Sequence, residues 1–376
     1  MQVRRRWLLG CAGAAAALSS PWVRAAPAAT LVLGQSVPLT GDASEIGLAY
    51  AGGAKLFVDS LNDRGEEGVR IELRQLDDGY SAERAAANAT KLLDTGCEVL
   101  FGFAGTASTL AAAQVAQRRG AIFFAPYAGP DVLRGAAYPL VYLARPSMAD
   151  EAFKMVQYCA TIGLKRIAFV GDDDALGRAG LEAVNRAVAE LKLPSLAATA
   201  VVPPNGTKVD AAVAAVKAVQ PQAIIQAALF RSTAAFIQKM RGAGYAGAFL
   251  NFSTVGIDPL YFALDKQIAG VVVSQVVPSP RSKATPIVRE YLTAIDATDQ
   301  TPSYEGLEGF IAAKTLAEAV RRAGRGAGGG AALQRALAGM GHFDVGGFRV
   351  SLRSGVREAA AAVELVAISA DGRLIR

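Results

Sequence analysis

The segment LVLGQSVPLTGDASEIGLAYAGGAKLFVDSLN, residues 31–62, combines three kinds of pattern in one run. Its apolar start predicts a strand, Pro38–Gly41 predicts a polar turn, and the residues from Ile46 to Asn62 predict a helix. A strand that leads through a Thr/Gly loop into a helix presents unpaired N–H groups at the helix start. The segment therefore predicts a βα unit that is suited to holding a small ligand.

The first 25 residues have the pattern of an export signal. Arg4–Arg6 form a basic head, residues 7–18 form an apolar segment, and Val23–Ala25 has the small-residue spacing of a cleavage site. We therefore expect cleavage after Ala25 and a mature protein in the periplasm. The Arg5–Arg6 pair also fits a twin-arginine signal, and the sequence leaves both export routes open.

The charge of the mature chain is nearly balanced. The whole chain has 39 basic and 33 acidic residues; four arginines leave with the signal, which leaves 35 basic residues and a net charge of +2. No block of Lys and Arg of the nucleic-acid-binding kind remains, so nucleic acid is not expected as a partner. After Ala25 no apolar run approaches the ~18 residues that span a bilayer, so the mature protein is expected not to span a membrane.

Cysteine and histidine are scarce. The mature chain keeps Cys97 and Cys159, which fall in different predicted lobes and are expected to be two buried thiols and not a disulfide. His342 is the only histidine, which removes most Ser/His/Asp, Cys/His and zinc arrangements. The sequence therefore predicts a protein that is not an enzyme and has no cofactor and no metal site.

About 350 mature residues exceed what one hydrophobic core usually organises, so two domains are expected. Short apolar strands alternate with amphipathic helices, and this βαβ repetition predicts an α/β fold with two doubly wound parallel-sheet lobes. The first series has an edge strand at 69–74, buried strands at 99–101 and 122–124, and helices at 82–94 and 108–118. The second series has strands at 166–170, 196–201 and 223–228, and helices at 176–191, 209–219 and 233–243.

Two proline-bearing segments mark the predicted crossings between the lobes. Arg145–Ser147 and Val277–Pro280 each follow a predicted strand, and proline makes such segments stiff hinges because it fixes φ and donates no hydrogen bond. Helices are expected at 286–297 and 304–322, and strands at 347–352 and 363–368 are expected to complete the second sheet. The predicted division is residues 1–25 as signal peptide, residues 26–145 with 278–345 as lobe I, and residues 146–277 with 346–376 as lobe II.

The candidate site lies in the loops that follow the two buried strands of the first series. In open parallel sheets, ligands bind beyond the carboxyl ends of the strands. The loop Ala104–Thr109 offers hydroxyls and free N–H groups that suit a carboxylate, and small residues there and at Gly129 allow close approach to the backbone. The alternative is that Ser108 and Thr109 are capping residues and Thr106 is a turn hydroxyl; the spacing fits both interpretations.

Other motifs favour structural roles. Ser253 follows a predicted strand, where it could face a cleft or cap a helix. Asp150–Glu151 begins a helix at a lobe crossing and is more typical of a cap than of an acid–base pair. Gly102–Gly105 lacks the third glycine and the downstream acid of a dinucleotide site, so a nicotinamide cofactor is not expected.

Several motifs, taken in chain order, resemble the leucine/isoleucine/valine-binding type of periplasmic receptor that serves ATP-driven importers. The likeness runs from about Leu31 to Arg376. The motifs are Pro38–Gly41 with Ile46–Gly47, Leu61–Asn62, Asp77–Asp78, the loop at 102–109, Ala125–Pro126, Arg166–Phe169, Ser274–Pro280 and Ser303–Gly309.

The resemblance implies the type I periplasmic binding protein fold, in which two lobes joined by three crossovers close on a buried ligand. It implies that Thr106 holds a ligand carboxylate with the backbone near Ala128 and Gly129. The acid that meets the α-ammonium in branched-chain receptors falls at Ser253. Because a buried ammonium needs a carboxylate partner, either Asp150 or another acid replaces it or the ligand has no amino group. By the same likeness, the residues that face the remainder of the ligand are Ile46, Tyr127 and Leu176. Independently of the likeness, the small residues Ala104, Gly105 and Gly129 let a ligand approach the backbone closely.

The expected function is the capture of a small carboxylate-bearing ligand by a monomer. The ligand is a branched-chain or other apolar amino acid, or an aliphatic or aromatic carboxylic acid. The expected partner is the membrane permease of an ABC importer with its ATPase. The alternatives are a receptor of the same fold that feeds a regulator, and a hydrolase, against which the single histidine argues.

Overall fold

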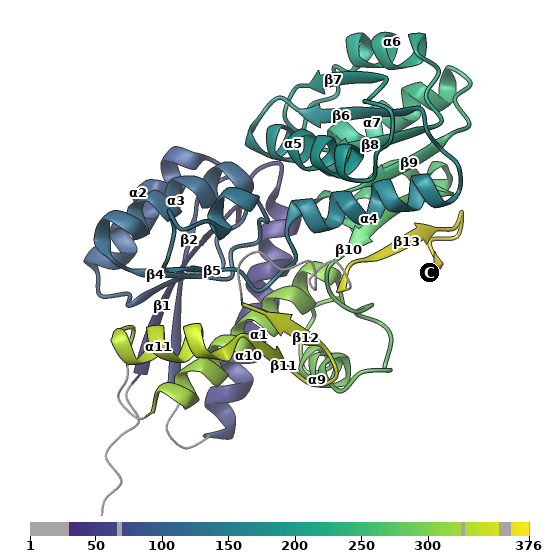
Figure 1. Cartoon of the computed structure of the whole chain (residues 1–376). Helices are drawn as coiled ribbons and strands as arrows, with labels where there is room; N and C mark the ends of the chain where they lie inside the picture. Colours follow the sequence, from purple (N-terminus) through teal and green to yellow (C-terminus); the bar gives the residue numbers. More distant parts are fainter. Residues whose placement is uncertain (1–29, 66–69, 325–327, 353–361, 376) are drawn as a thin grey trace, which may run out of the picture.

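The computed structural model of the protein describes residues 30–65, 70–324, 328–352 and 362–375. These residues form two α/β lobes, one around a five-stranded sheet and one around a seven-stranded sheet (Figure 1). The predicted signal peptide lies outside the described residues and remains a prediction. None of the helices in the described ranges is long and apolar enough to cross a bilayer.

The first sheet is parallel, with the strand order β2-β1-β3-β4-β5. β2 lies at the edge, as its period-two pattern predicted. β3 and β4 are buried along their whole length, which explains their continuous apolar sequences. The strands are β1 (Thr30–Val37), β2 (Arg70–Asp77), β3 (Val99–Phe101), β4 (Ile122–Phe124) and β5 (Val141–Tyr142).

Helices from both ends of the chain cover the first sheet (Figure 1). α2 packs on α3, and α1 packs on α10. The second pair crosses so closely that a Cβ at Gly53 would lie 1.8 Å from the carbonyl oxygen of Gly306, so the side-chain-free glycine is required there. The helices are α1 (Ser44–Arg64), α2 (Ala82–Asp94), α3 (Thr106–Arg119), α9 (Pro286–Ile295), α10 (Tyr304–Ala323) and α11 (Ala331–Met340), with the 3-10 turn η1 (Asp131–Arg134).

The second sheet has the strand order β14-β13-β10-β9-β8-β6-β7. The strands from β6 to β10 are parallel, and β13 and β14 add an antiparallel edge. The predicted strands of this sheet, apart from the one at 347–352, are confirmed to within a few residues. They are β6 (Ile167–Asp172), β7 (Ala198–Val202), β8 (Ala223–Ala227), β9 (Ala248–Asn251), β10 (Val271–Gln275), β13 (Glu364–Ile368) and β14 (Leu374–Ile375).

The helices of the second lobe pack in pairs, α4 on α5 and α7 on both α6 and α8. Ser147 and Asp150 form a capping box at the start of α4, which confirms the interpretation of Asp150 as a cap. The sequence did not predict α8 or α11, two short helices that directly follow glycines. The helices are α4 (Met148–Thr161), α5 (Ala175–Glu190), α6 (Asp210–Ala218), α7 (Phe230–Gly242) and α8 (Ile257–Leu264), with the 3-10 turns η2 (Ser253–Val255) and η3 (Asp265–Ile268).

The segment at 347–352 does not join the second sheet, so that prediction was wrong. β12 (Arg349–Ser351) instead pairs antiparallel with β11 (His342–Asp344). The Asp344 carboxylate accepts hydrogen bonds of 2.7 Å from the N–H groups of Gly346 and Gly347, and this tight turn folds β12 back onto β11. The Gly346 carbonyl accepts a hydrogen bond from Ile287 of α9, which attaches the ribbon to lobe I.

The chain passes between the lobes three times, from β5 to α4, from β10 to α9 and from β12 to β13. We propose the predicted limits of the lobes with one change: the ribbon residues 346–351, predicted in lobe II, belong to lobe I. Cys97 and Cys159 are both buried and free, as predicted.

Candidate functional site

A pocket lies between the lobes, beyond the carboxyl ends of strands from both sheets. Its volume is about 20 Å³, room for about one water molecule, so the lobes are closed over it. A larger ligand can enter only when the lobes part or side chains move. The lining residues are Pro38, Ala43, Ile46, Tyr80, Ala104, Gly105, Thr106 and Tyr127 from lobe I, and Leu176, Leu229 and Thr254 from lobe II.

The structure brings six of the nine predicted site residues into this lining: Ile46, Ala104, Gly105, Thr106, Tyr127 and Leu176. Ala128, Gly129 and Ser253 lie outside the lining. Gly129 supports the first crossover, because its carbonyl oxygen accepts a hydrogen bond of 2.9 Å from the N–H of Met148 at the start of α4.

The two predicted loops are joined to each other. The Tyr127 N–H donates to the Phe103 carbonyl at 2.7 Å, and the Gly105 N–H donates to the Tyr127 carbonyl at 3.3 Å. Gly105 is the N-cap of α3 and makes no side-chain cap, so the alternative that Ser108 or Thr109 caps this helix is wrong. Thr106 is therefore the first helical residue, at the end of α3 where the helix leaves its N–H groups unpaired.

Tyr80 lines the pocket, although the sequence gave no reason to select it. Its backbone has φ +65°, a left-handed conformation that is uncommon for a bulky residue. A Cβ at Gly105 would lie 2.6 Å from a ring carbon of Tyr80, and Gly105 itself has φ +95°. The glycine at the start of α3 is therefore required both by its own backbone and by the tyrosine ring that packs on it. The only sequence signal was the Asp-Asp-Gly turn before Tyr80.

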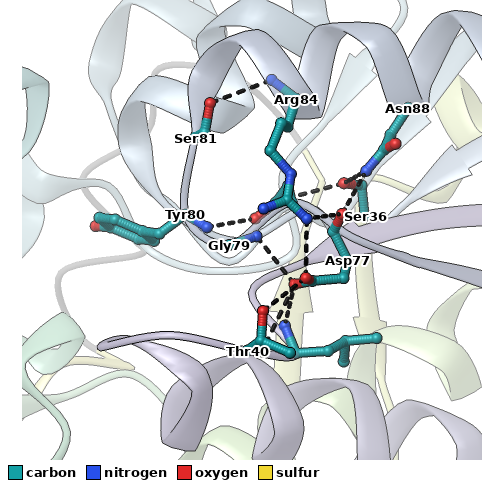
Figure 2. Close-up of polar contacts among 10 residues, drawn as sticks. Ser36, Thr40, Asp77, Gly79, Tyr80, Ser81, Arg84 and Asn88 are labelled. Carbon is teal, nitrogen blue, oxygen red and sulfur yellow. Dashed lines mark hydrogen bonds and ion pairs between the residues drawn. The ribbon is translucent and has the colours of Figure 1, made fainter.

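A cluster of polar contacts, here called the loop cluster, holds Tyr80 in place (Figure 2). It consists of Asp77 and Asp78 with the groups that donate to them. The Asp77 carboxylate accepts hydrogen bonds from the N–H groups of Leu39 at 2.8 Å and Gly79 at 2.9 Å. It also accepts one from the Thr40 hydroxyl at 2.7 Å, and it pairs with Arg84 at 2.9 Å. Asp77 therefore ties the loop after β1 to the loop after β2.

The two acids of the loop cluster differ in pKa. Partial burial acts against ionisation of Asp77, but the hydrogen bonds from Thr40, Gly79 and Leu39 outweigh it and hold its pKa well below the usual range. Asp78 accepts from the Ser36 hydroxyl at 2.8 Å and from the Tyr80 N–H at 2.9 Å. Burial raises the pKa of Asp78 to about 6 in spite of these bonds.

Tyr127, the second tyrosine in the pocket lining, follows a strained backbone residue that is held by a hydrogen bond. Ala125, two residues before Tyr127, has φ +49°, and the Tyr50 hydroxyl donates a hydrogen bond of 2.6 Å to its carbonyl oxygen. The Tyr50 and Tyr127 rings lie 5.2 Å apart. Strained residues that are held by their surroundings are common at ligand sites.

Behind Tyr127 lies a buried group of charges, here called the hinge cluster: Arg145, Glu151, Glu305 and Glu308. The Arg145 side chain is 1% exposed, and its guanidinium carbon lies 4.8 Å from the centre of the Tyr127 ring. Its nitrogens lie 3.4 Å from an oxygen of Glu151 and 3.4 Å from an oxygen of Glu308. Arg145 therefore joins the first crossover to an acid of each lobe.

Burial raises the pKa of Glu305 and of Glu308 to about 7. Burial also opposes the charge on Arg145, but the Glu308 and Glu151 carboxylates outweigh it and raise the pKa of the guanidinium above its usual range. Two of the acids around this permanent cation, Glu305 and Glu308, thus titrate near neutral pH.

Ser253 belongs to the edge of the hinge cluster. Its N–H donates to Glu151 at 2.8 Å, and Arg145 donates a hydrogen bond to its hydroxyl. Asp150, the other possible partner of a ligand ammonium, accepts hydrogen bonds of 2.8 Å from the Ser147 N–H and hydroxyl. Neither position places a carboxylate in the lining of the pocket.

Polar contacts between the lobes close the mouth of the pocket. The Asp42 carboxylate pairs with Arg231 at 2.8 Å, and the Asp42 carbonyl accepts a hydrogen bond of 2.9 Å from the Asn205 side chain. Asp42 lies in lobe I and its two partners lie in lobe II. These contacts exist only while the lobes are closed.

A metal site and a second hollow are the other candidates for a binding site. Among the residues that the structure describes, no group of three His, Cys, Asp or Glu side chains is placed to hold a metal. A larger hollow of about 570 Å³ lies between the crossover segments and the β11–β12 ribbon. It is lined by the crossover residues after β5 and β10, whereas the pocket between the lobes is lined by loops that follow strands of both sheets, so we propose that the ligand binds in the latter.

Two lobes with a pocket at their strand ends and three connecting segments define the type I periplasmic binding protein fold. The sequence model described as periplasmic binding protein matches residues 30–373, and the chain belongs to this family. It is a family of binding proteins, and the chain is accordingly a binding protein and not an enzyme.

The comparisons with individual proteins agree. Leu/Ile/Val-binding protein homolog 8 of Brucella abortus (strain 2308) is 25% identical over 348 residues, 85% of this chain and 83% of the relative. A solved structure of a possible leucine/isoleucine/valine-binding protein from Rhodopirellula baltica SH 1 is 28% identical, with a TM-score of 0.85 over 94% of this chain and 98% of its own. A branched chain amino acid ABC transporter from Thermus thermophilus with bound valine shares the fold, with a TM-score of 0.79 at 17% identity over 92% of this chain and 95% of its own.

Proposed function

We propose that this chain is the periplasmic substrate-binding protein of an ABC importer, which closes on a small carboxylate-bearing ligand and delivers it to a membrane permease with its ATPase. The observation that carries the proposal is the pocket lined by both lobes, with the start of α3 on one side and Leu176, Leu229 and Thr254 on the other. The proposed ligand is an apolar amino acid or another small carboxylic acid. The Brucella and Rhodopirellula relatives, whose names refer to leucine, isoleucine and valine, support this class.

The ligand carboxylate is assigned to the start of α3. Thr106 is 3% exposed, lines the pocket and is the first residue of α3, where unpaired N–H groups and the helix dipole favour an anion. Ile46, Tyr127 and Leu176, together with Tyr80, would surround the apolar remainder of the ligand. In the same proposal, the backbone near Ala128 and Gly129 completes the carboxylate site once the lobes have opened and closed again on the ligand.

Closure then reports that the site is occupied. A ligand that contacts both lobes binds the closed state better than the open state, and its differential affinity shifts the population toward closure. The Asp42 contacts with Arg231 and Asn205 add a modest contribution, since exposed ion pairs are worth roughly 0.2–1 kcal/mol. We propose that the permease recognises the closed form of the mature monomer.

The experiment is a calorimetric comparison of Thr106→Ala with Thr106→Ser. The probe is the tightest binder among L-leucine, L-phenylalanine, isocaproate and hydrocinnamate. Thr106→Ala removes a hydrogen bond to a charged group, about 1.5–3 kcal/mol, so affinity should fall roughly 10- to 150-fold. Thr106→Ser keeps the hydroxyl and should stay within a few-fold of the wild type. Equal affinities for the wild type and Thr106→Ala would remove Thr106 from the carboxylate site.

A further inference from the structure

The lining of the interlobe pocket is apolar apart from hydroxyl groups and backbone. Its polar side chains are Tyr80, Thr106, Tyr127 and Thr254, and within the described part of the chain no carboxylate lines it. Thr254 is 7% exposed, and its hydroxyl oxygen is buried without a hydrogen-bond partner in the described structure. An unpartnered buried hydroxyl on the opposite lobe from Thr106 is an independent indication that a ligand group belongs there.

The acids nearest to the lobe II side of the pocket are engaged with the protein. Asp172 accepts hydrogen bonds from the Ser232 hydroxyl at 2.6 Å and from the Leu229 N–H at 3.0 Å. Asp174 caps α5 by accepting from the Leu176 N–H at 2.8 Å. These carboxylates hold the loops that present Leu229 and Leu176 to the ligand, so an ammonium group would have to compete with those backbone bonds.

Glu151, which contacts Ser253 next to Thr254, is also engaged with protein donors. Glu151 accepts from the Ser253 N–H at 2.8 Å and from the Ser274 hydroxyl at 2.6 Å, and it pairs with Arg145 at 3.4 Å. The charge that reaches Ser253, next to Thr254, is the Arg145 guanidinium. A ligand ammonium beside Ser253 would therefore approach this cation. Glu305 of α10 is the other acid near this end, since a Cβ at Gly256 would lie 3.6 Å from its carboxylate, but Glu305 does not line the pocket.

We infer that the pocket takes apolar monocarboxylates that carry no α-ammonium group. This inference rests on the proposed function and narrows its ligand class to aliphatic and aromatic carboxylic acids. The carboxylate binds at the start of α3, and the apolar body lies between Tyr80 and Tyr127 on one lobe and Leu176 and Leu229 on the other. A neutral hydrogen-bonding substituent, such as a hydroxyl or a keto group, suits Thr254, because a hydroxyl both donates and accepts.

The test uses matched acids that differ only in the amino group. Binding of the full mature chain is measured by calorimetry for L-valine against isovalerate, L-leucine against isocaproate and L-phenylalanine against hydrocinnamate. A buried charge without a partner is strongly unfavourable, so in at least one pair the acid without an amino group should bind about 100-fold more tightly. Equal or tighter binding of the amino acid in every pair overturns the inference and leaves carboxylate capture standing. Binding of none of the six acids overturns both proposals.

A gain-of-function variant sharpens the test. Thr254→Asp supplies the missing carboxylate, and Thr254→Asn is its neutral control of the same shape. The ratio of the affinities for the acid and its amino-acid partner should shift at least about tenfold toward the amino acid in Thr254→Asp and stay unchanged in Thr254→Asn. The same ratio in both variants contradicts the inference. The wild-type comparison decides the question even where a variant does not fold.

Discussion

The loop cluster and the hinge cluster hold the two ends of the same pocket, and they use carboxylates in opposite ways. Asp77 of the loop cluster receives several protein N–H and O–H donors, which replace water and keep the acid ionised with a depressed pKa. Glu305 and Glu308 of the hinge cluster are buried around the single cation Arg145, and their pKa rises to about 7. The difference shows that burial raises the pKa of an acid at this site unless enough donors stabilise its charged form.

Removal of Arg145 should cause the largest loss of stability. In Arg145→Met, Glu151 and Glu308 lose their buried cation, and the free energy of unfolding should fall by about 3–5 kcal/mol at pH 8. Urea unfolding followed by circular dichroism measures this change. The matched control is Arg84→Met in the loop cluster. Arg84 pairs with Asp77 at 2.9 Å, but its side chain is 55% exposed, so the loss should stay within about 1 kcal/mol.

Losses of equal size in the two arginine variants would contradict this difference between the clusters. The same would hold if Arg145→Met were as stable as the wild type at pH 8, above the pKa of about 7 of Glu305 and Glu308.

Removal of the Asp77 charge should have the second largest effect. Asp77→Asn keeps the side-chain shape but weakens the hydrogen bonds from Leu39, Thr40 and Gly79, so unfolding should cost about 1.5–3 kcal/mol less. Because this loop presents Tyr80, ligand affinity should fall in the same variant.

The control for Asp77→Asn is Asp59→Asn, an exposed acid that pairs with Lys55 on α1. Its stability should change by no more than about 0.5 kcal/mol and its ligand affinity should not change. A loss of stability in Asp77→Asn without any change in ligand affinity would show that the loop cluster supports the fold and does not position Tyr80.

The sequence could predict the elements that are encoded locally. The buried strands β3 and β4 were predicted at their observed residues because their apolar runs are continuous. The pocket loops that follow these two strands were predicted because ligands bind beyond the carboxyl ends of parallel strands. The ribbon of β11 and β12 was missed because its turn depends on Asp344 accepting two glycine N–H groups, which a strand pattern does not reveal.

Residues that act through distant partners could not be predicted. Tyr80 reaches the pocket because Asp77 and Asp78 hold its loop to residues about 40 positions earlier in the chain. Arg145 was predicted only as part of a hinge, since its acids lie at positions 151 and 308 and meet only after both lobes have formed. The role of Ser253 as a partner of Glu151 likewise depends on a contact across 102 positions.

The smallest expected effect is a change in the free energy of unfolding with pH, to which the two clusters contribute differently. The pKa of Glu308 is about 7 in the folded protein and 4.5 in its ordinary state, so folding favours the protonated acid. This contribution is fully present below about pH 4.5 and is lost as the pH rises through about 7, so the wild type should gain stability when the pH is lowered from 8 to 5. Glu305, with a pKa raised to about 7, and Asp78 and Asp172, with pKa values raised to about 6, add to the gain with the same sign. Asp77 acts in the opposite direction, but only well below pH 4.

The variant Glu308→Gln isolates the hinge cluster within this pH profile. It should remove on the order of 1–2 kcal/mol of the gain between pH 8 and pH 5, because a pKa shift of one unit corresponds to about 1.4 kcal/mol. The part that is due to Glu305, Asp78 and Asp172 should remain. Urea unfolding of both proteins across this range measures the difference, and parallel profiles would mean that Glu308 stays ionised beside Arg145. In that event the hinge cluster would keep its charge as Asp77 does, and the contrast between the two ends of the pocket would be lost.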